Sequence, residues 1–187
     1  MTDLHVADQS HSIRGHWRLD VYEGDIVRER LPWRKRAWNL YADLRWKLLG
    51  VMADRYYRGA VVNAHVQTIE GTNLVTTAGK GLIMDRLYGL SAVSAVSRTG
   101  VGTSATAAAV VNTSLTGGVF KAFDSTPVRS ALTVTSITTF GTGDANISWN
   151  ELGQDNATTL LNRIAPIGPF NKTTAVSIIV THALTQS

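Results

Sequence analysis

The sequence lacks most of the residues and runs that usually identify a function. It contains no cysteine, which excludes disulfides, thiolate nucleophiles and cysteine-ligated metal sites. Charged residues make up only 17% of the chain, whereas roughly a quarter is usual in soluble domains. No run reaches the roughly 18 apolar residues of a membrane span, and the first residues lack the apolar segment of a secretory signal. So little charge is typical of a protein that buries surface against a partner, or of a β protein rich in Ser and Thr.

Candidate catalytic and metal-binding residues are equally scarce. None of the five histidines falls in a metal-binding spacing, and we interpret His65 and His182 as packing or hydrogen-bonding residues of strands. Asp144 and Glu151 could form the carboxylate pair of a glycosidase. Asp144, however, lies in a Gly-Thr-Gly-Asp turn, where aspartate is common. The sequence therefore predicts no enzyme, no cofactor, no metal and no small-molecule substrate.

The composition divides the chain into three parts. Residues 1–13 are polar and unpatterned and predict a flexible arm. Residues 14–69 predict a hairpin over Gly15–Arg30, with its turn at Gly24, followed by a helix rich in Trp and Arg. Residues 70–187 predict a β-sandwich domain.

Beyond residue 91, short β-branched runs alternate with turn residues. This spacing predicts a mainly β protein, an antiparallel β-sandwich of jelly-roll-like form with a helical insertion near the N-terminus. The last run is mostly apolar and should be a central strand. The pattern also predicts a turn at Glu70–Thr72, a helix over Ala78–Leu90, and a bulge or turn at Asn150–Gly153. The expected strands are Ala131–Phe140, Ala145–Trp149, Leu160–Ile164 and Ala175–Leu184.

The segment Trp33–Arg58 is the most distinctive part of the sequence. Pro32 marks a helix start and Gly59 a helix stop, and apolar residues recur every three or four positions between them. Because Trp and Arg are enriched at interface hot spots, we interpret this segment as a helix that docks onto a protein neighbour. The candidate interface residues are Trp33, Arg34, Arg36, Trp38, Tyr41, Arg45, Trp46, Leu49 and Tyr56.

The basic character of this segment also admits nucleic acid or an acidic membrane surface as partner. Asp43 and Asp54 interrupt the basic run, and the tryptophans alternate with apolar positions. We therefore favour an acidic protein neighbour over both. The apolar residues form two adjacent stripes, one of Ala37, Tyr41, Leu44, Leu48 and Met52 and the other of Trp38, Ala42, Trp46, Leu49 and Ala53.

Several short motifs resemble, in order, those of small virion structural proteins of tailed phages. The resemblance covers roughly residues 14–30 and 70–187, and Leu31–Ile69 is an insertion relative to it. In those proteins the first motif follows an N-terminal hairpin and opens a helix. The matching segments are TNLVTTAGK (72–80), similar to NLVTNAG; TGVGTS (99–104), similar to VGTGTT; ISWNELG (147–153), similar to NELGLFN; and LNRI (161–164) with FNKT (170–173), similar to LARI and PITKT.

This resemblance implies a structural role in a virion that assembles in the cytoplasm of the bacterial host. The chain is then expected to assemble non-covalently with itself, as a homo-oligomer, and with other virion proteins. A tail fibre, a tail adaptor or another tail-associated protein fits this role, and a capsid decoration protein is an alternative. A carbohydrate-binding module for host attachment is a different class, in which Trp149 with Phe140 would supply the aromatic platform.

Overall fold

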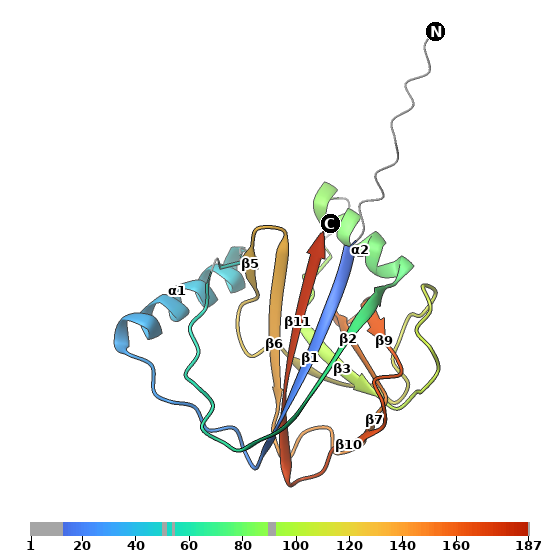
Figure 1. Cartoon of the computed structure of the whole chain (residues 1–187). Helices are drawn as coiled ribbons and strands as arrows, with labels where there is room; N and C mark the ends of the chain where they lie inside the picture. The colour runs from blue at the N-terminus through green and yellow to red at the C-terminus, as the bar shows by residue number, and fades with distance from the viewer. Residues whose placement is uncertain (1–12, 50–51, 54, 90–92, 187) are drawn as a thin grey trace.

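The computed structural model describes residues 13–49, 52–53, 55–89 and 93–186, so the predicted arm lies outside the described residues except for Ile13. Strands account for 42% and helices for 17%, which confirms a mainly β protein (Figure 1). The elements are β1 (Ile13–Glu23), α1 (Trp33–Leu49), β2 (His65–Val75), α2 (Thr77–Tyr88), β3 (Arg98–Gly102), β4 (Val119–Ala122), β5 (Val128–Ser130), β6 (Thr133–Phe140), β7 (Ser148–Trp149), β8 (Glu151–Asp155), β9 (Leu160–Ile164), β10 (Phe170–Asn171) and β11 (Val176–Gln186).

One large antiparallel sheet dominates the fold. Its nine strands follow the order β4-β3-β8-β9-β2-β1-β11-β6-β5, and β10 pairs with β7 separately. The long strands β1 and β11 pair from Ile13 with Gln186 to Glu23 with Val176, so β11 is the central strand that its apolar sequence predicted. The sheet curls on itself (Figure 1), which gives the sandwich-like architecture expected from the sequence, with α1 as the helical insertion.

The core lies between the two sides of this curled sheet. Trp17, Leu19 and Val21 of β1 face it because alternate residues of a strand point to the same side. A buried hydrogen bond from Thr138 Oγ1 on β6 to Thr99 Oγ1 on β3 (2.8 Å) joins the two sides. The buried apolar residues of the core are Trp17, Leu19, Val21, Val101, Phe140, Trp149, Leu152, Ile178 and Val180.

The hairpin predicted over Gly15–Arg30 is wrong. Strand β1 pairs with β11 and β2 instead of with the chain that follows it. After the turn at Gly24 the chain runs beside residues 60–62, where Val62 N donates to Val27 O (3.1 Å). A local turn motif therefore gave the right bend but the wrong partner, because the long strands β2 and β11 occupy both edges of β1.

The turn predicted at Glu70–Thr72 is also wrong, since β2 continues through these residues to Val75. Glu70 is accommodated in the strand by an ion pair with Arg18 of β1 (3.6 Å). Gly71 lies close to the Ile164 side chain, since a Cβ atom at this position would lie 2.6 Å from Ile164 Cδ1. The boundary expected between residues 69 and 70 therefore falls inside β2.

Two further strand predictions are corrected. Asn150–Gly153 is no bulge or turn: Glu151 starts β8, and all of its residues are buried between β3 and β9. In the run Ala145–Trp149 only Ser148 and Trp149 are strand, as β7. The polar residues of β8 have partners distant in the sequence: Glu151 pairs with Arg163, Gln154 donates to Ser136, and Asp155 pairs with Arg98. The local sequence does not reveal these partners.

The helix expected over Ala78–Leu90 is confirmed as α2. Thr76 caps it, since its Oγ1 accepts from Gly79 N (2.9 Å) and donates to Leu160 O of β9 (2.6 Å). A Cβ atom at Gly79 would lie 2.0 Å from Leu161 O. The motif Thr-Thr-Ala-Gly thus combines a helix cap with close packing of α2 on β9.

His182 of β11 is a buried packing residue, as expected. Its ring packs against that of Trp17 at a tilt, with centroids 4.3 Å apart, and its Nε2 lies 3.3 Å from Asn73 Nδ2. Burial lowers the pKa of His182 from 6.5 to about 3, so the imidazole is neutral in the folded protein at neutral pH.

This burial predicts a stability that falls on mild acidification. The unfolded chain binds a proton at His182 below pH 6.5, whereas the folded chain does so only near pH 3. Stability is therefore complete above the higher value and is lost as the pH falls between the two. We expect the free energy of unfolding to decrease by up to about 1.4 kcal/mol per pH unit between about pH 6 and about pH 4.5. Urea unfolding at several pH values measures this slope, and His182→Gln should flatten it; equal slopes in the two proteins would contradict the assignment.

Candidate protein-binding surface

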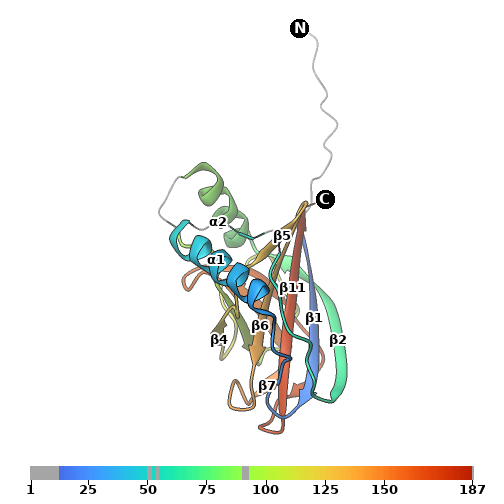
Figure 2. The same cartoon turned by 90° about the vertical axis from the view of Figure 1, so that its left-hand side faces the viewer.

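Helix α1 lies at the side of the molecule, next to β5 and β6 and away from β2 (Figure 1, Figure 2). It begins at Trp33, directly after Pro32, and ends at Leu49. The predicted extension to Arg58 is wrong, because the described residues between Met52 and Arg58 are not helical. Those residues return along α1 and hold it.

Two polar side chains fix the inner side of α1. Asn39 Nδ2 donates to Tyr57 O (2.7 Å), and Asn39 Oδ1 accepts from Tyr57 N (3.0 Å). One turn further along, the Asp43 carboxylate accepts from Tyr56 Oη (3.0 Å) and from Thr126 Oγ1 (2.9 Å). Burial and the adjacent Asp43 raise the pKa of Tyr56 to about 12, so its hydroxyl remains a donor at neutral pH. These hydrogen bonds, together with the buried Ala42, hold the helix in one orientation.

The opposite side of α1 presents large apolar side chains to solvent. Trp33, Leu40 and Leu48 are 72%, 72% and 71% exposed, and Leu44 and Tyr41 are 54% and 50% exposed. Their recurrence at intervals of three, four and seven residues places them on one side of the helix. We call these five residues the outer stripe. Its position reverses the usual arrangement, in which a helix turns its apolar side toward its own core.

Cationic side chains border the outer stripe. The Arg34 guanidinium lies 5.5 Å from the Trp33 ring centroid, and the Arg45 guanidinium lies 5.6 Å from the Tyr41 ring centroid. Cations at this distance interact favourably with an aromatic face. Asp43, the only acidic residue in the sequence of α1, belongs to the inner side. The outward surface therefore combines an apolar centre with a positive border.

The structure brings together five of the predicted interface residues. Trp33 and Tyr41 belong to the outer stripe, and Arg34, Arg36 and Arg45 lie beside them on the helix. Leu49 ends the helix and is also exposed, at 71%. The prediction omitted Leu40, Leu44 and Leu48; the spacing of Leu44 and Leu48 had already placed them in an apolar stripe.

Three predicted interface residues lie on the inner side instead. Trp38 Nε1 donates to Arg55 O (3.0 Å), and Tyr56 is held by Asp43. Trp46 lines a mainly apolar cavity of about 390 Å³, whose walls include residues of α2, β6 and β11. These side chains position the helix, and the outward surface is formed without them.

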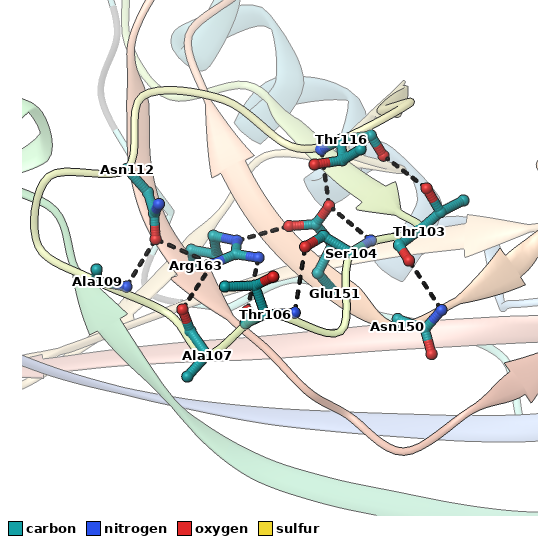
Figure 3. Close-up of polar contacts among 10 residues, drawn as sticks. All are labelled: Thr103, Ser104, Thr106, Ala107, Ala109, Asn112, Thr116, Asn150, Glu151 and Arg163. Carbon is teal, nitrogen blue, oxygen red and sulfur yellow. Dashed lines mark hydrogen bonds and ion pairs between the residues drawn. The ribbon is translucent and has the colours of Figure 1, made fainter.

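A second polar feature lies in the β-sheet, where Glu151 of β8 forms a buried ion pair with Arg163 of β9 (Figure 3). Arg163 Nε lies 2.6 Å from Glu151 Oε2, and the side chains are 4% and 0% exposed. Glu151 Oε1 also accepts from Ser104 N (3.2 Å) and Thr116 N (2.7 Å). The pair therefore fastens the loop between β3 and β4 to the sheet. Arg163 donates further to Asn112 Oδ1 (2.9 Å), Thr106 O (3.0 Å) and Ala107 O (3.2 Å).

The structure forms neither of the sites considered for sugar chemistry. Glu151 is buried in the ion pair just described, and Asp144 forms an ion pair with Lys121, whose hydrogen bond lowers the pKa of Asp144. The aromatic platform of Trp149 with Phe140 is wrong, because both side chains are 0% exposed. Their rings pack edge to face in the core, with centroids 4.9 Å apart.

The part of the chain that the structure describes contains neither a metal-binding cluster nor a membrane-spanning helix. There, no three His, Asp or Glu side chains come together as ligands for a metal ion, and neither helix is long and apolar enough to cross a membrane. Comparison with protein-family models, with curated proteins and with solved structures gives no match.

Proposed function

We propose that the protein is a structural component of a tailed-phage virion and docks through the outer stripe of α1 onto a neighbouring virion protein. The observation that carries this proposal is the orientation of α1, which presents the large apolar side chains of the outer stripe to solvent while Asn39 and Asp43 bind the protein on its inner side. Clustered apolar side chains on a surface mark interaction sites. The motif resemblance supports the virion as the setting, with a tail fibre or adaptor as the preferred role and a capsid decoration protein as the alternative.

The outer stripe can supply the free energy of a stable contact. Full burial of one large apolar side chain contributes about 1.5–3 kcal/mol. The outer stripe has several such side chains exposed, among them Trp33 and Leu44. The contacts of Asn39 and Asp43 fix the helix before binding, so little backbone entropy is lost when the partner arrives.

The partner proposed here has an apolar groove with an acidic rim. Arg34, Arg36 and Arg45 border the stripe, and complementary charge at the rim accelerates association and selects the partner. Nucleic acid fits less well, because contacts of Lys and Arg with phosphates supply most of the affinity for nucleic acid, whereas the middle of this surface has Leu44 and Tyr41.

Association with particles tests the proposal. Particles produced by the genome that encodes this chain are banded on a density gradient, washed at high salt and probed with an antibody. We expect the protein to sediment with the particles in a constant ratio to their other structural proteins. Protein that remains in the soluble fraction, or that binds anionic vesicles as well as it binds particles, would overturn the proposal.

A further inference from the structure

Strand β2 lies between β9 and β1 in the strand order of the large sheet, yet most of its edge on the β9 side is unpaired. Strand β2 pairs with β1 along most of its length, but with β9 only through Leu74 with Arg163 and Val75 with Asn162. Beside His65–Asn73, no strand of the described chain pairs with the other edge, and β2 forms the margin of the molecule in Figure 2. We call this stretch the free edge. Its backbone groups on that side have the geometry to accept another strand.

The free edge has few of the features by which proteins usually block such pairing. The strands at the two ends of the sheet are short, four residues in β4 and three in β5, as is common for protected edges. The free edge is longer and contains neither proline nor lysine. One irregularity in its pairing with β1 lies near its start, opposite Val21 and Tyr22. Its one charged residue, Glu70, already forms an ion pair with Arg18 on β1 (3.6 Å).

We infer that the free edge pairs with the free edge of a second copy of the chain, antiparallel and around a two-fold axis at Ile69. Ile69 is the midpoint of His65–Asn73, so this register uses the whole stretch. It places Glu70 opposite Thr68 of the second copy, which avoids the repulsion of two glutamates facing each other. It also places the two Ile69 side chains, which pack against the core, next to each other on the same side of the joined sheet.

A second copy fits this edge better than an unrelated peptide because the edge is complementary to itself under two-fold rotation. Both views place α1 on the far side of β1 and β11 from β2 (Figure 1, Figure 2). The pairing therefore joins two sheets into one while leaving both outer stripes free to dock. This inference rests on the proposed function for its setting, and it specifies the contact by which the chain assembles with itself.

Engineered disulfides test the contact directly, because the chain has no cysteine of its own. In the proposed register, Val66 of one copy lies opposite Thr72 of the other, at the Cα separation of about 4.5–5.5 Å that a disulfide accepts. Within one chain the same positions are separated by roughly 20 Å of extended strand, so they can be linked only between copies. Mild oxidation of full-length Val66→Cys/Thr72→Cys should give a covalent dimer on a non-reducing gel. The matched controls, Val119→Cys on β4 and Ser130→Cys on β5, should remain monomeric on the same gel.

Charge substitution at the same positions gives an independent test. Val66→Lys/Thr72→Lys places like charges opposite each other in the dimer but leaves exposed positions exposed in the monomer. Light scattering should show a wild-type dimer, and in the lysine variant a dissociation constant raised by roughly tenfold or more with an unchanged thermal unfolding midpoint. A wild-type monomer at all concentrations would overturn the inference. A dimer that persists in the lysine variant and is linked through Ser130→Cys would overturn the inference too. Neither outcome would bear on the docking of α1, which is tested separately on particles.

Discussion

Replacing Arg163 with methionine is expected to lower the free energy of unfolding by about 3–5 kcal/mol. Glu151 is 0% exposed and ion-paired with Arg163 at 2.6 Å, so the variant leaves a buried carboxylate without its counter-ion. The substitution also removes the hydrogen bonds that hold the loop between β3 and β4 at Asn112. Urea unfolding at neutral pH measures the loss.

A matched pair of variants separates this explanation from loss of packing. Glu151→Leu/Arg163→Met removes both charges, and it should recover part of the stability lost in Arg163→Met, because no unpaired charge remains buried. Arg18→Met removes one partner of an ion pair whose arginine side chain is 51% exposed, and its effect should be much smaller. A similar loss in Arg163→Met and Arg18→Met would contradict the role given to the buried pair.

Leu44→Asp/Leu48→Asp should abolish docking without affecting the fold. The two side chains are 54% and 71% exposed, so the isolated protein keeps its core and its unfolding free energy. In the complex each aspartate would be buried opposite an apolar groove. Loss of a single hot spot costs about 2 kcal/mol, or roughly 30-fold in affinity, so the amount of variant protein recovered with purified particles should fall below detection.

The control for this variant is Leu87→Asp on α2, where the leucine is 72% exposed. It introduces a single aspartate on a helix outside the outer stripe, and its recovery with particles should equal that of the wild type. Equal recovery of all three proteins would show that the outer stripe is not the docking surface.

The central strands could be predicted because their own sequences specify them. Strand β11 is a long apolar, β-branched run, and its position between β1 and β6 follows from that composition. Strand β9 was predicted with its bounds, Leu160–Ile164. Helix α2 was predicted over Ala78–Leu90, and the structure adds the Thr76 cap, whose Oγ1 accepts from Gly79 N.

The strands that carry charge or glycine could not be predicted from local sequence. The local sequence around Glu151 predicts a bulge or turn, yet Glu151 lies in a fully buried strand because Arg163 of the next strand neutralises its charge. Glu70 and Gly71 likewise predict a turn, but Arg18 forms an ion pair with Glu70, and Ile164 fills the space beside Gly71. In each case the deciding partner is distant in the sequence.

For α1 the sequence predicted the stripes but not which of them faces outward. Periodicity shows that Tyr41, Leu44 and Leu48 share one side of a helix, but it carries no information on what packs against that side. The clue lay in Asn39 and Asp43, polar residues one turn apart on the opposite side. Their hydrogen bonds to Tyr57 and Tyr56 turn the apolar side away from the protein.

The central claim is that a partner covers the outer stripe in the assembled particle, and hydroxyl-radical footprinting tests it most directly. The protein is oxidised in isolation and in purified particles, and the modification of Trp33, Tyr41 and Leu44 is compared with that of Leu87 and Tyr88 on α2, which are 72% and 66% exposed. We predict that all five residues react in the isolated protein, and that in particles the outer stripe is protected while the α2 residues still react. An outer stripe that reacts equally in both states would contradict the account.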